Sequence, residues 1–152
     1  MKCRPYLREI GSDTVRALVR AGRVADTAKL LEWNCHPIGV PTGQVTGGVY
    51  RVAGTALEQD VELAWSIVLK IVSSPESDAG SVFQDIAHPL YWKREVLAYR
   101  SGLLDNLPGG LDAPRCPATV EQPDGSYGPW SDDGQDRYGP RWPVHQYERA
   151  AQ

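Results

Sequence analysis

Apolar and polar residues alternate along two segments of the chain, a pattern typical of β-strands. The runs Val49–Ala53 and Trp65–Val72 are rich in β-branched and aromatic residues, and a polar, acidic stretch separates them. We predict an antiparallel pair joined by a polar connector. Alternation within the second run puts its members on two faces, one with Trp65, Ile67, Leu69 and Ile71, the other with Ser66, Val68, Lys70 and Val72.

Three further strands complete the predicted sheet. The apolar residues between positions 30 and 38 suggest a first strand, which ends near Pro37 and is followed by a glycine-rich turn over residues 43–48. Two short strands are predicted at residues 115–121 and 126–130, because Pro123-Asp-Gly125 between them is a strong turn signal. Residues 131–141 have the composition of a linker.

Helical spacing occurs in three places. A short capped helix, predicted as an accessory element, covers about residues 12–21. A longer helix is predicted over residues 89–104, with a packing stripe at Trp92, Val96, Tyr99 and Leu103. Pro143 opens a third helix, which stops at Gln152 after about two turns. The pattern thus predicts an α+β fold in which one helix crosses a five-stranded antiparallel sheet.

Length, composition and charge indicate what kind of protein this is. The 152 residues, 41% of them hydrophobic, suffice for one globular core, which we assign to residues 1–133, with residues 134–152 as a linker and the start of a further lobe. The net charge of −3 and the lack of a basic run argue against nucleic-acid binding. With neither a signal peptide nor a membrane span in the sequence, we expect a soluble, cytoplasmic protein.

Cysteines and histidines show no metal-binding pattern. Cys3, Cys35 and Cys116 are odd in number and far apart, so we expect reduced thiols rather than disulfides or a zinc site. The histidines share no ligand spacing either, and we assign no role to His36, His88 or His145.

Lys70 is the residue that most needs a partner. A lone lysine inside an apolar strand is costly to bury unless it meets a carboxylate or a phosphate. Glu95, on the predicted helix, is the candidate carboxylate, and a nucleotide could then place its phosphates at Lys70 and its adenine against Val68. The pattern alone equally allows Lys70 to reach solvent at a sheet edge and Glu95 to be an ordinary surface residue.

Most of the chain resembles the aminoglycoside phosphotransferase-like small-molecule kinases, which share the bilobal protein-kinase-like fold. The resemblance rests on segments that occur in the expected order: Gly48–Val52, Ser66–Lys70, Tyr91–Tyr99, Ser101–Leu104, Leu107–Leu111, Ala113–Cys116 and Glu121–Gly125. In that family these segments belong to the N-terminal, ATP-gripping lobe. The resemblance implies that ATP is the ligand, with Mg expected only in a complete enzyme.

The glycine-rich turn matches the kinase phosphate loop only in part. Gly47 and Val49 fit the last two fixed positions of G-x-G-x-x-G-x-V, whereas Thr42 and Gln44 replace the earlier glycines. Thr46 could donate its hydroxyl to a phosphate, although ordinary turn chemistry explains the segment as well. The candidate nucleotide contacts are therefore Lys70, Glu95, Val68, Val49, Thr46, Gly47 and Gly48.

Two features depart from the family. The segment that joins the lobes usually continues as an apolar strand, but here it contains Pro129, which cannot donate a ladder hydrogen bond. The catalytic H-x-D loop is also missing, because no histidine in the sequence has an aspartate two residues later. We therefore assign no catalytic residue and no metal ligand.

The sequence leads us to expect an isolated or truncated N-terminal kinase lobe that binds ATP weakly and is inactive alone. One alternative is a non-catalytic binding or regulatory module that pairs with a separately encoded second lobe, and another is an unrelated α+β interaction domain. Because several large apolar residues lie in a C-terminal tail that is too short to bury them, we also expect an exposed apolar surface and self-association. These residues are Trp130, Trp142, Val144 and Tyr147.

Overall fold

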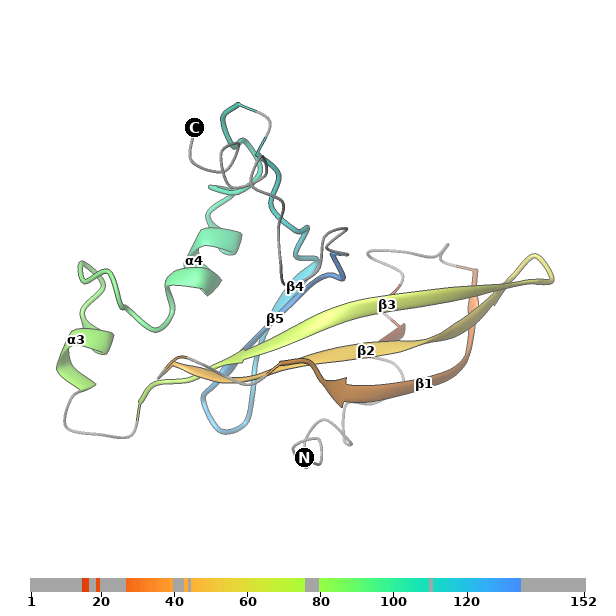
Figure 1. The fold of residues 1–152 in the computed structure, drawn as a ribbon, viewed down its shortest axis with the longest axis horizontal. Coiled ribbons are helices and arrows are strands. Elements are labelled where there is room, and N and C mark those ends of the chain that lie inside the picture. The colour runs from red at the N-terminus through yellow and green to blue at the C-terminus, as the bar shows by residue number, and fades with distance from the viewer. Residues whose placement is uncertain are drawn as a thin grey trace, which may run out of the picture.

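The computed structural model of the chain describes residues 15–16, 19, 27–39, 43, 45–75, 80–109 and 111–134. Within them a five-stranded antiparallel sheet has the order β1-β2-β3-β5-β4. Its strands are β1 (Lys29–Pro37), β2 (Thr46–Glu58), β3 (Val61–Val72), β4 (Ala118–Glu121) and β5 (Tyr127–Asp132). Two short helices, α3 (Gly80–Gln84) and α4 (Arg94–Arg100), lie near one end of the sheet, while the β2–β3 hairpin projects at the other (Figure 1). The predicted class, a sheet-dominated α+β fold, is confirmed.

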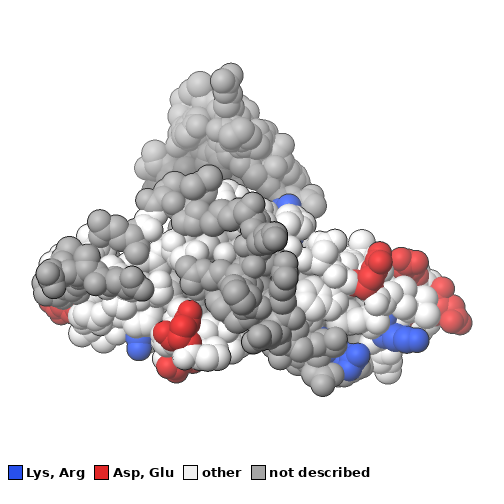
Figure 2. Space-filling view, turned by 90° about the horizontal axis from the view of Figure 1, so that it is seen from below, with Lys and Arg blue, Asp and Glu red and all other residues white. Residues whose placement is uncertain are grey.

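The hairpin of β2 and β3 is longer than predicted. Its two strands are joined only by Gln59 and Asp60, whose φ angles are 48° and 64°, as a type I′ turn requires. The predicted polar connector is therefore wrong, although the antiparallel pairing is right. Of the acidic residues, Glu58 and Glu62 belong to the paired strand ends and Asp60 to the turn, where the hairpin projects. Figure 2 shows acidic side chains gathered at this tip.

The main core lies on one face of the sheet. The alternation predicted for β3 is confirmed, since Trp65, Ile67, Leu69 and Ile71 are all buried. Trp130 of β5 is only 1% exposed in the same cluster, so its predicted place on an exposed apolar surface is wrong. It pairs with Leu69 on β3, and the register turns it inward. The other three residues of that predicted surface lie outside the described residues.

The N-terminal segment contributes to this core. Val15 and Val19 are helical and fully buried against the sheet, as expected for part of the helix predicted over residues 12–21. Both side chains belong to the main core. The sequence suggested an accessory element here, whereas these two residues pack within the core. The two ends of that predicted helix lie outside the described residues.

Gly54 allows β1 to approach β2 closely. The register between the two strands shifts between Leu30 and Glu32, beside Gly54. A Cβ atom at position 54 would lie 2.0 Å from the carbonyl oxygen of Glu32, far inside van der Waals contact. The absence of a side chain therefore lets the irregular part of β1 pack against the hairpin.

Helix α4 is shorter than the helix predicted over residues 89–104. The residues before it form separate turns: the N–H groups of Tyr91 and Arg94 donate to the carbonyl oxygens three residues earlier, and the Trp92 N–H donates to the Phe83 carbonyl oxygen of α3 at 3.0 Å. Gly102, with φ 72°, follows the helix, and Leu103 is 66% exposed rather than part of a packing stripe. The sequence also gave no sign of α3.

A second, smaller cluster lies between α4 and the opposite face of the sheet. It joins Val72 of β3 and Tyr127 of β5 to Trp92 and Val96. Helix α4 thus contacts β3, β5 and β4 near one end of the sheet (Figure 1).

The two C-terminal strands occur where the turn signal placed them. β4 begins three residues later than predicted, and β5 continues through Ser131 and Asp132, which we had assigned to the linker. Pro129 is buried and pairs with Thr119 of β4. On its other side the β3–β5 ladder is interrupted between the pairs Leu69–Trp130 and Val72–Tyr127, as expected for a residue without an N–H group. The rest of the predicted linker and the predicted third helix lie outside the described residues.

No helix in the described part of the chain is long and apolar enough to cross a membrane.

Candidate functional site

Lys70 and Glu95 form a direct ion pair between β3 and α4. The Lys70 Nζ donates a hydrogen bond to Glu95 Oε2, and each side chain is 34% exposed. Of the two possibilities left open by the sequence, the structure shows the paired arrangement. Each side chain also keeps an exposed part, from which the ammonium can contact a bound anion.

Aromatic and cationic side chains hold α4 in the position that this pair needs. The rings of Trp92 and Tyr127 lie 5.9 Å apart at an angle of 55°. The Lys93 ammonium lies 4.7 Å and 4.9 Å from their centroids, and the Arg100 guanidinium lies 5.2 Å from that of Tyr127. Because these contacts link α4 to β5, they fix the helix rotation that directs Glu95 toward Lys70.

The glycine-rich segment has a different conformation from the predicted turn. Thr46 and Gly48 belong to β2 and pair with Val72 and Ile71, with a register shift at Gly47 between them. The predicted turn over residues 43–48 is therefore wrong for its last three residues, since the hairpin ladder extends over them. A Cβ at Gly48 would lie 2.6 Å from the Tyr50 ring, which explains this glycine by packing.

The hairpin nevertheless gathers the candidate residues at one end of the sheet. Val49 pairs directly with Lys70, and Val68 lies two residues before Lys70 in β3, on the same face. Thr46, Gly47 and Gly48 lie beside the end of β3, next to Lys70. One surface thus contains the β2 and β3 candidates, with Glu95 facing it from α4.

An ion pair that sequence reasoning missed lies on this surface. Arg51 Nε and Nη2 donate to the two carboxylate oxygens of Asp133 at 2.7 Å and 3.0 Å, in a bidentate arrangement. The bond to Asp133 raises the pKa of Arg51. The side chain of Asp133 is only 7% exposed, whereas that of Arg51 is 38% exposed. Alternation along β2 could have placed Arg51 on the Lys70 face, but no local signal links it to a residue 82 positions away.

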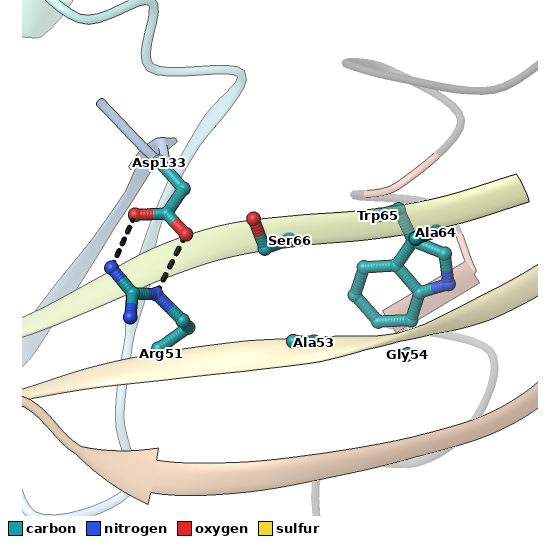
Figure 3. Close-up of a pocket in the computed structure, with 7 residues that line it drawn as sticks. All are labelled: Arg51, Ala53, Gly54, Ala64, Trp65, Ser66 and Asp133. Atoms are coloured by element: carbon teal, nitrogen blue, oxygen red, sulfur yellow. Dashed lines mark hydrogen bonds and ion pairs between the residues drawn. The ribbon is translucent and has the colours of Figure 1, made fainter. Parts of the chain in front are cut away.

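A hollow of about 720 Å³ opens beside this pair. Ala53, Gly54, Ala64 and Ser66 line it together with Trp65, Arg51 and Asp133, so most of its lining residues are small (Figure 3). Small residues on two adjacent strands leave room for a flat group above the hairpin. Along β3, the hollow lies on one side of the Arg51–Asp133 pair and Lys70 on the other. Ser66 and Ala64, which line the hollow, precede Val68 in the strand, whereas Lys70 follows it.

Two titratable groups lie near Glu95. Burial, and then the charge of Glu95, raises the pKa of the Tyr99 phenol above its ordinary value. Burial is also the main cause that raises the pKa of the Cys116 thiol, whose Sγ lies 3.3 Å from the Ala118 carbonyl oxygen. At neutral pH Cys116 is therefore a protonated thiol, a poor nucleophile. Cys35 and Cys116 are both free, and Cys3 lies outside the described residues.

In the part of the chain that the structure describes, no group of three or more His, Cys, Asp or Glu side chains could hold a metal ion. The Lys70–Glu95 pair offers a cation oriented by a carboxylate on a half-open sheet face. No protein-family model, curated protein or solved structure that we compared with this chain matches it.

Proposed function

We propose that this chain is a nucleotide-binding module of the kind that small-molecule kinases use to hold ATP. The observation that carries the proposal is the Lys70–Glu95 ion pair. A strand lysine oriented by a helix glutamate is the arrangement with which protein kinases hold the α- and β-phosphates of ATP. Support also comes from the antiparallel sheet and from Val49 and Val68 beside the lysine.

In this proposal each residue has a defined task. Glu95 holds the ammonium of Lys70 over the sheet, so the side-chain entropy of the lysine is already lost before the nucleotide binds. Lys70 then neutralises phosphate charge, while Val68 and Val49 offer an apolar surface to the nucleoside. The Thr46 hydroxyl and the backbone of Gly47 and Gly48 lie at the end of the strand where the phosphates would extend.

The module does not transfer phosphate by itself. Phosphoryl transfer needs metal ions at the phosphates and a carboxylate that orients the attacking hydroxyl. The sequence contains no H-x-D motif, and we assign neither group to these residues. A partner that supplies them, such as a separately encoded catalytic lobe, would be required for kinase activity.

Calorimetric titration with ATP and magnesium tests the proposal. We expect weak binding, about 4–6 kcal/mol, because only one side of the nucleotide is gripped. Lys70→Ala should abolish measurable binding, and Glu95→Gln should weaken it, because the ammonium loses its orienting charge. Lys29→Ala is the matched control, since it removes the same charge from an exposed position on β1.

A coupled assay for ADP release should show no turnover by the purified chain. Turnover that disappears in Lys70→Ala would contradict the assignment of a binding module without catalysis. Unchanged ATP binding in Lys70→Ala would contradict the proposed site itself.

A second candidate function is that of a protein-interaction module. Several large apolar side chains around α4 are exposed, and a shallow hollow of about 310 Å³ lies among them. They are Ile86, Leu90, Leu97 and Leu103. Such a surface is common where another protein binds. The partner would be a separately encoded lobe or a second copy of the chain.

A further inference from the structure

The Arg51–Asp133 pair crosses the sheet directly over the proposed nucleoside position. Arg51 pairs with Val68 across the β2–β3 ladder, and Ser131 pairs with Val68 across the β3–β5 ladder. Asp133 follows two residues after Ser131, level with Ser66. Arg51 lies on β2 and Asp133 directly follows β5, so the two charged residues flank β3, about 10 Å apart. The register places their link over β3 between Val68 and Ser66, and Figure 3 shows it passing over β3 close to Ser66.

This link is firmly held. Both carboxylate oxygens of Asp133 accept a hydrogen bond from the guanidinium, and the carboxylate is almost completely covered. A bidentate pair with one buried partner resists separation more than an ordinary surface pair does. A flat base placed on Val68 would meet this link, because both occupy the same face of β3.

We propose that the Arg51–Asp133 pair is a gate that keeps the nucleoside part of the site closed until a ligand opens it. This inference rests on the proposed nucleotide function and adds a regulatory contact to it. The phosphate end of the site at Lys70 lies two residues from Val68 and stays open to anions. The gate thus lowers affinity for a complete nucleotide but leaves affinity for a bare polyphosphate unchanged.

The experiment compares two ligands on the full chain. ATP and inorganic tripolyphosphate are titrated calorimetrically, with magnesium, into the wild type, Asp133→Asn and Arg51→Gln. We expect both variants to bind ATP about three- to tenfold more tightly, the range that follows from losing such a pair. Tripolyphosphate, which has no base, should bind all three proteins equally.

The matched control is Arg115→Gln. Arg115 lies 3.9 Å from Asp132, so this variant removes the same charge and a neighbouring ion pair away from Val68. Its ATP affinity should equal that of the wild type. If Arg51→Gln does not fold because the nearly buried Asp133 carboxylate loses its bidentate ion pair, Asp133→Asn still tests the gate.

The outcomes separate the gate from the proposed function. ATP affinity that is unchanged or weaker in both gate variants, while binding still requires Lys70, would overturn the gate and leave the nucleotide module standing. An equal gain for tripolyphosphate would show a general charge effect and would also overturn the gate. Loss of all binding by wild type and variants alike would overturn the nucleotide module, and the gate with it.

Discussion

At the scale of single residues, the surroundings of Glu95 determine the alkaline stability of the protein. Cys116 and Tyr99 both have raised pKa values, mainly because they are partly buried. The folded protein therefore keeps protons that the unfolded chain loses at the ordinary values of 9.0 and 10.0. Since the unfolded state then binds fewer protons, the free energy of unfolding must fall as pH rises through this range.

We expect urea denaturation to show a loss of stability that begins as pH rises through the ordinary values of 9.0 for the thiol and 10.0 for the phenol. Cys116→Ser should reduce this slope, because a serine hydroxyl does not titrate here and can donate to the same Ala118 carbonyl oxygen. Tyr99→Phe should reduce it at the upper end of the range. An identical slope in wild type and both variants would show that other groups control alkaline unfolding.

At the scale of elements, the turn of the β2–β3 hairpin limits the stability of the protein. Gln59 and Asp60 both have positive φ, which costs non-glycine residues free energy, and the favoured pair for this turn is Asn-Gly. We predict that the double variant Gln59→Asn/Asp60→Gly increases the free energy of unfolding by about 1 kcal/mol. Thermal and urea denaturation would measure the change.

A suitable control for the hairpin is Glu62→Gln. It removes an acidic charge from an exposed position near the same tip without changing the turn. If this control stabilised the protein as much as the turn variant did, charge repulsion at the tip rather than backbone strain would be the cause.

At the scale of the whole molecule, the exposed apolar surface around α4 predicts self-association. Leu97 is 39% exposed on α4 and lines the shallow hollow there. Sedimentation velocity should show concentration-dependent dimers, which Leu97→Asn weakens by removing apolar area from the contact. Leu31→Asn on β1, where the leucine is 46% exposed, should have no such effect. A chain that stays monomeric at all concentrations would argue against the interaction module.

The sequence by itself determined the parts that depend on local pattern. Period-two alternation was enough to separate the two faces of β3 and to place Lys70 on the face opposite Trp65, Ile67, Leu69 and Ile71. The Pro123-Asp-Gly125 signal located the β4–β5 turn, because turn residues act through their own backbone. The elements that it misjudged have ends set by contacts with other segments, as at α4, before which the Trp92 N–H donates to the Phe83 carbonyl oxygen of α3.

Only the tertiary structure decided how distant residues meet. The sequence left two outcomes for Lys70 and Glu95, because pairing depends on the rotation of α4, which Trp92, Lys93 and Tyr127 fix by packing. It gave no hint of the Arg51–Asp133 pair, whose members are brought together by the register of three strands. Alternation assigns a residue to a face, but the neighbours on that face come from strand order, and strand order is a property of the whole sheet.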